Sequence, residues 1–87
     1  MQTLYRKQLG SCINSYFKFV IGDNVEECVY CIEERQFESP VESSVVLQKR
    51  EYDNSMKYIL QSSEQCTKTE WEEAVKRAKQ MMKEMTQ

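Results

Sequence analysis

The clearest element of the sequence is an amphipathic helix at residues 67–85, which read TKTEWEEAVKRAKQMMKEM. Thr67 and Glu70 match a capping box, in which each side chain accepts a hydrogen bond from the other residue's free backbone amide. Acidic residues fill the first turn and basic residues the later turns, as the helix dipole favours. Apolar side chains recur at helical spacing, and these are Trp71, Ala74, Val75, Ala78, Met81, Met82 and Met85. The sequence therefore predicts one long helix over residues 68–85, whose apolar stripe needs a packing partner.

Residues 15–34 predict two neighbouring β-strands. Residues 15–21 are rich in aromatic and β-branched side chains, and residues 22–24 form a turn signal. Residues 25–34 are apolar on both faces, which is typical of a central strand. These faces carry Cys28, Tyr30 and Ile32 on one side and Val29 and Cys31 on the other.

The remaining sequence predicts two further strands. They fall at residues 45–52 and 56–61, with a turn signal at residues 53–55 between them. Residues 35–44, which include the single proline, fit a loop. Residues 1–12 suit either a helix or an edge strand.

These elements predict an α+β fold, because one exposed sheet face is the simplest partner for the helix stripe. We expect an antiparallel meander of about four strands with one C-terminal helix packed on one sheet face. Residues 1–87 are expected to form a single small α+β domain. No apolar run is long enough to cross a membrane, and no apolar stretch follows Arg6 and Lys7 to make a signal peptide. The expected location is cytoplasmic, with no membrane partner.

The composition argues against an enzyme. The chain contains no histidine, and histidine is the usual proton shuttle and the commonest metal ligand. It has only two glycines, which are the residues that let backbone amides wrap a phosphate. Neighbouring carboxylates in a strand face opposite ways and cannot flank one substrate. We therefore predict no catalytic residue and no cofactor.

Four cysteines carry the one motif with metal chemistry. Cys28 and Cys31 are spaced as in a zinc knuckle, and with Cys12 and Cys66 they match the ligand count of an all-cysteine zinc site. In a strand, however, residues three apart point to opposite faces, so the two sulfurs would diverge. Buried thiols that act as small apolar side chains are the preferred interpretation, and a four-cysteine zinc domain stays an alternative.

The charge is unevenly distributed along the chain. The net charge is −2, yet residues 23–42 carry seven acidic side chains and one basic one. Such a segment would attract basic surfaces and repel nucleic acid. The basic side chains of residues 68–87 share their helix with four acids, so we predict no direct nucleic-acid binding. The candidate partner-binding residues are Asp23, Glu26, Glu27, Glu33 and Glu34.

These observations favour a non-enzymatic protein-binding module. The expected role is a small inhibitor or regulator of phage or mobile-element type, using its acidic hairpin against a basic surface on a larger protein. If that protein is a nucleic-acid enzyme, the carboxylates would stand in for phosphates, as in an anti-restriction or anti-CRISPR inhibitor. The alternative is a self-assembling structural protein that pairs through an edge strand, either residues 45–52 or the N-terminal segment, as in a homodimer.

Overall fold

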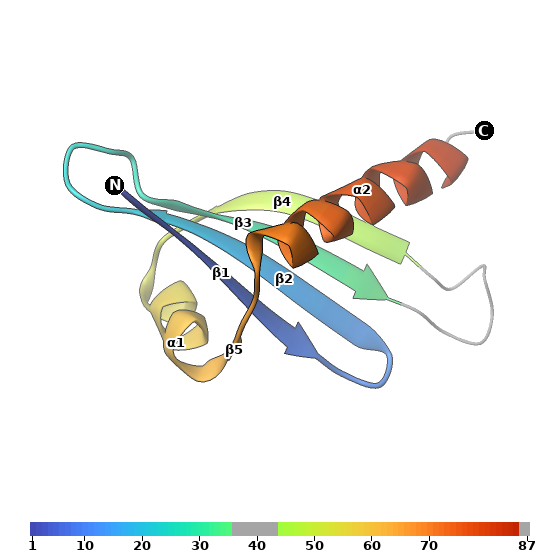
Figure 1. The fold of residues 1–87 in the computed structure, drawn as a ribbon, viewed down its shortest axis with the longest axis horizontal. Helices are drawn as coiled ribbons and strands as arrows, with labels where there is room; N and C mark the ends of the chain where they lie inside the picture. The colour runs from blue at the N-terminus through green and yellow to red at the C-terminus, as the bar shows by residue number, and fades with distance from the viewer. Residues whose placement is uncertain (36–43, 86–87) are drawn as a thin grey trace.

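The structure is a computed structural model that describes residues 1–35 and 44–85, with residues 84 and 85 described by their backbone alone. In chain order the elements are β1 (Gln2–Leu9), β2 (Ile13–Ile21), β3 (Cys28–Arg35), β4 (Ser44–Glu51), α1 (Asn54–Ser62), β5 (Glu64–Gln65) and α2 (Lys68–Met85) (Figure 1). The predicted loop at residues 35–44 falls almost wholly outside the described residues.

The strands form one antiparallel sheet in the order β4-β3-β2-β1-β5. The α+β class and the antiparallel sheet with a C-terminal helix on one face are confirmed. The ambiguous first residues form β1, which pairs with β2 along its whole length from Gln2 opposite Ile21 to Leu9 opposite Asn14. β3 has a strand on each side, as its two apolar faces predict.

The helix α2 crosses one face of the sheet. Its buried residues Trp71, Ala74 and Ala78 pack against Tyr16, Ile32 and Val45, which come from β2, β3 and β4. The two alanines keep the helix close to the strands because they add almost no bulk between the two layers. The predicted capping box is present, since the Glu70 amide donates to Thr67 Oγ1 (3.0 Å) and the Thr67 amide donates to Glu70 Oε1 (3.4 Å).

A second helix, α1, covers part of the opposite face, and here the sequence prediction is wrong. Residues 56–61 were expected to form a fourth strand, but they belong to α1. The cause is Asp53, whose Oδ1 accepts a hydrogen bond from the Met56 amide (3.0 Å) and so caps a helix instead of closing a hairpin turn. Met56, Ile59 and Leu60 then recur at helical spacing and pack on the sheet.

The α1 side of the sheet has its own apolar core. Its buried side chains are Phe17, Phe19, Val29, Cys31 and Met56. The sheet is therefore covered on both faces, and its inner strands must be apolar on both. Neither helix of the described residues combines the length and the apolar character needed to cross a membrane.

Candidate partner-binding surfaces

The five predicted carboxylates do not form one acidic face. Asp23, Glu26 and Glu27 lie in the connection between β2 and β3, whereas Glu33 and Glu34 lie near the far end of β3. Glu33 comes six positions after Glu27 along extended chain, so at roughly 3.3 Å per residue the two groups are about 20 Å apart. The sequence predicts a single acidic hairpin surface, whereas the structure shows two separate groups of carboxylates.

The two groups differ in their surroundings. Asp23 and Glu26 are exposed, and neither has an ion-pair partner in the described part of the chain. The exposed Glu27 accepts a hydrogen bond from the Gly22 amide (3.1 Å), in a turn where Gly22 has a φ of 143°. Glu33 pairs with its neighbour Arg35 (3.0 Å). The connection between β2 and β3 is therefore the more accessible negative end.

Glu34 is a buried structural group instead of a surface acid. Only 3% of the residue is exposed, because α2 lies over it. Arg77 of α2 donates to Glu34 Oε1 through Nε (3.1 Å), and its Nη2 also donates to the Tyr16 hydroxyl (3.3 Å). The guanidinium lies 5.6 Å from the centre of the Tyr16 ring. A buried carboxylate needs such a partner, so this cluster fixes α2 on the sheet.

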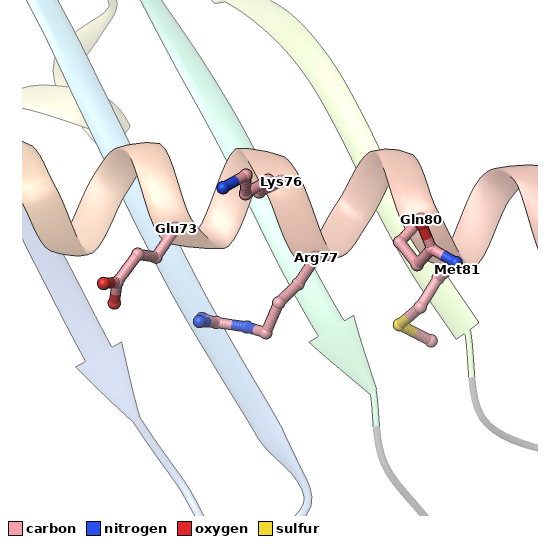
Figure 2. A pocket seen from close by; sticks show the side chains of 5 residues that line it. All are labelled: Glu73, Lys76, Arg77, Gln80 and Met81. Carbon is pink, nitrogen blue, oxygen red and sulfur yellow. The ribbon is translucent and has the colours of Figure 1, made fainter.

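An open groove of about 560 Å³ runs along the flank of α2 that carries Arg77. Figure 2 shows its described lining, in which Glu73, Arg77 and Met81 point to the same side of the helix. Lys76 and Gln80 complete the lining. These groups offer hydrogen bonds, charge pairing and one apolar contact, which is the chemistry of a binding surface.

A smaller cleft lies on the other face of the sheet, beside α1. Its volume is about 130 Å³, below the size range of most small-molecule sites but enough for one side chain. β4 supplies Val46, Gln48 and Arg50 to its wall, and Cys31 lies in its lining. Burial raises the pKa of the Cys31 thiol to about 11, so the thiolate that acts as nucleophile is scarce at neutral pH.

The structure does not unite the four cysteines. Cys28 and Cys31 are buried on opposite faces of β3, as their spacing in a strand predicts. Cys12 is exposed after β1, and Cys66 lies between β5 and α2. All four thiols are free, and the described residues contain no group of three or more side chains placed to hold a metal ion.

The chain itself covers part of the β1 edge, at the two residues that pair with β5, and we call this side the closed edge. β5 pairs with Arg6 and Lys7, and the Lys7 ammonium lies 2.6 Å from Glu70 Oε2 at the start of α2. The hydrogen bond from Lys7 holds the pKa of Glu70 below its ordinary value, and the same bond raises the pKa of Lys7.

The β4 edge has no strand beyond it in the described part of the chain. The prediction that residues 45–52 supply an edge strand is confirmed in position, and its pairing with a second copy stays a prediction. Two exposed apolar side chains flank this edge, Leu47 on β4 (38% exposed) and Met82 on α2 (36% exposed). Figure 2 shows α2 crossing β4 near Gln80 and Met81 and continuing past it. We call the turns beyond β4 the overhang of α2.

Comparisons with known proteins give no relative: no family model, no curated protein and no solved structure matches this chain. The surfaces above therefore carry the functional argument alone.

Sequence reasoning did not find the groove or the cleft, because each depends on where the helices cross the sheet. One signal for the β4 side was present. Three methionines lie close together near the C-terminal end of the predicted helix, and these are Met81, Met82 and Met85. The burial of Glu34 had no comparable signal, since its neighbour Glu33 has the same chemistry and stays partly exposed.

Proposed function

We propose that this protein is a non-enzymatic protein-binding module that engages a larger protein through its β4 side. One observation carries the proposal: the open β4 edge is flanked by Leu47 and Met82, with the exposed cations Lys49 and Arg50 beside them. Among the residues that the structure describes, neither cation has an ion-pair partner. Apolar anchors surrounded by a polar rim, with arginine enriched, are typical of a protein interface.

The test is capture of a partner at low salt with matched variants. We expect Leu47→Asp together with Met82→Asp to abolish binding of the protein that the unmodified chain captures, because two anchors become charged. Tyr58→Asp is the control, since Tyr58 is also exposed (70%) but lies on α1. Circular dichroism should show that all variants fold. Equal capture by the double variant would refute the β4 side as the interface.

A second candidate surface is the acidic connection between β2 and β3. Its support is the exposure of Asp23 and Glu26 without ion pairs in the described residues. In that arrangement the carboxylates contact a basic surface of the partner. The protein would then be an inhibitor of a nucleic-acid enzyme, of anti-restriction or anti-CRISPR type. Asp23→Lys with Glu26→Lys should then abolish capture, whereas the Leu47 and Met82 changes should not.

A further inference from the structure

We propose that the β4 edge receives an extended acidic segment of the partner, which joins the sheet as a sixth strand below the overhang of α2. This inference rests on the proposed function and specifies the occupant of the same surface. The segment turns apolar side chains toward α2 and acidic side chains toward the cleft beside Arg50.

The backbone of β4 is suited to receive a strand. Its eight residues contain neither proline nor glycine, and they pair with β3 in unbroken register from Ser44 opposite Arg35 to Glu51 opposite Cys28. Half of the amide and carbonyl groups of such a strand point away from its partner, to the open side. Strand addition satisfies these groups by main-chain hydrogen bonds and uses alternate side chains for specificity.

The overhang of α2 supplies a cover for the added strand. Ala78 packs in the same cluster as Val45 of β4, and α2 continues to Met85. From Met81, near which α2 crosses β4, the four further residues to Met85 extend about 6 Å at roughly 1.5 Å each, and neighbouring strands lie about 4.8 Å apart. The overhang therefore reaches above the position of a sixth strand. Met82 faces solvent there, and methionine adapts its shape to many apolar partners.

The charge of β4 indicates which side chains the added segment presents on its face away from α2. Arg50 lines the cleft together with Val46, Gln48 and Glu33, on the face opposite α2, and Glu33 is already paired with Arg35. Lys49, its neighbour, is also exposed. An acidic side chain on the added strand, directly across from Arg50, would give this guanidinium the partner that the described chain does not provide.

Within the described residues of β4, a second copy of the chain does not supply an acidic side chain across from Arg50. A two-fold axis perpendicular to the sheet pairs β4 with itself in antiparallel fashion and keeps each face on its own side. Arg50 then lies across from another residue of its own face, and that set is Ser44, Val46, Gln48 and Arg50 itself. None of these is acidic. The register that pairs Lys49 with Glu51 also sets Arg50 against its own copy, which is repulsive.

The experiment uses two fluorescein-labelled nine-residue peptides, one alternating valine with glutamate and the other alternating valine with lysine. Fluorescence anisotropy at low salt should show binding of the glutamate peptide at least about tenfold tighter than the lysine peptide. Arg50→Glu should abolish that preference, and Met82→Asp should weaken binding of the glutamate peptide. Lys68→Glu at the exposed start of α2, on the β1 side of the sheet, makes the same charge change as Arg50→Glu and should leave both affinities unchanged.

Hydrogen exchange then tests the geometry, because a bound strand should slow exchange of the outward amides of β4. Failure of the glutamate peptide to bind, or equal binding of both peptides, overturns the acidic strand. A concentration-dependent dimer that the peptide dissociates would place a second copy at the edge and also overturn it. If the peptide fails while capture of a protein still depends on Leu47 and Met82, the proposed function stands and only this occupant falls.

Discussion

At the β1 edge of the sheet the chain returns and pairs β5 with Arg6 and Lys7, whereas at the β4 edge no described strand follows. The β1 edge is also tied to α2 by the Lys7–Glu70 pair and by Trp71, whose ring lies 6.3 Å from that of Tyr5. An open strand edge is a template for pairing with another chain, and proteins commonly block it. This protein covers part of the β1 edge and extends a helix past the β4 edge, so the contacts that hold the fold are separate from the surface that we propose binds a partner.

The largest expected effect comes from removing the anchor at the closed edge. Trp71→Ala should lower the free energy of unfolding by about 3–5 kcal/mol, because it leaves a cavity under the first turns of α2. Small domains have only about 5–15 kcal/mol in total, so this variant should be close to unfolding. Urea denaturation followed by circular dichroism measures the change.

Met82→Ala is the matched change at the open edge, where the side chain is partly exposed. It should alter the free energy of unfolding by less than about 0.5 kcal/mol. A cost as large as that of Trp71→Ala would mean that the overhang is needed for the fold, and the contrast between the two edges would fail.

Breaking the ion pair between α2 and β3 should lower the free energy of unfolding by somewhat less than Trp71→Ala does. Arg77→Met leaves the Glu34 carboxylate buried without its partner, and breaking a buried pair costs about 3–5 kcal/mol. Since Arg77 is half exposed, we expect the lower end of that range. The double variant Glu34→Leu with Arg77→Met should recover most of the stability, and a double-mutant cycle would report it. Additive losses in that cycle would show that the two side chains do not interact.

A pH-dependent effect of modest size is expected at the closed edge. The lowered pKa of Glu70 stabilises the fold above the ordinary pKa of glutamate, and this contribution is lost as the pH falls through the lowered value. The raised pKa of Lys7 stabilises the fold below the ordinary pKa of lysine and is lost as the pH rises past the raised value. The gap in melting temperature between the unmodified chain and Lys7→Met should therefore be largest near neutral pH and shrink in acid. A gap that is unchanged in acid would contradict the role of Glu70.

The smallest perturbation is alkylation of the cysteines at neutral pH, which leaves the folded state unaltered until a thiol reacts. Cys12 is exposed and should react first with iodoacetamide. Cys66, partly buried beside β5, should follow, because burial raises its pKa. Of these three thiols Cys31 should react last, since its pKa is raised to about 11 and it is shielded by α1 and β4. Peptide mapping by mass spectrometry gives the order, and faster labelling of Cys31 than of Cys66 would mean that the β4 side opens more readily.

Local signals in the sequence were sufficient for much of the fold. The capping box at Thr67 and the spacing of the apolar side chains define α2, and the apolar faces of residues 28–32 define a central strand. The error at residues 56–61 has a physical cause. Asp53 is a good residue for a turn and equally for a helix N-cap, and a six-residue apolar pattern is too short to separate the two.

The candidate site was less accessible to sequence reasoning than the fold. The count of charges along the sequence places Glu33 and Glu34 in one group with Asp23. In the structure they lie about 20 Å from the connection between β2 and β3, and Glu34 is buried. Burial of a charged residue depends on where a distant helix crosses, and here Arg77 is 43 positions away from Glu34. The position of an edge strand, in contrast, follows from local pattern, because the second half of β4 is polar on both faces.

The return of β5 to β1 has a consequence for the order in which the molecule assembles. Within the four-strand meander from β1 to β4, each pairing joins strands that are neighbours in sequence, so each hairpin can close early. The Lys7–Glu70 contact joins residues 63 positions apart, and closing that loop costs more entropy. During synthesis the four-strand meander is therefore exposed at both edges and on one whole face until residues 64–85 have left the ribosome. The pairing of β5 with β1 is therefore the last strand pairing of the sheet to form.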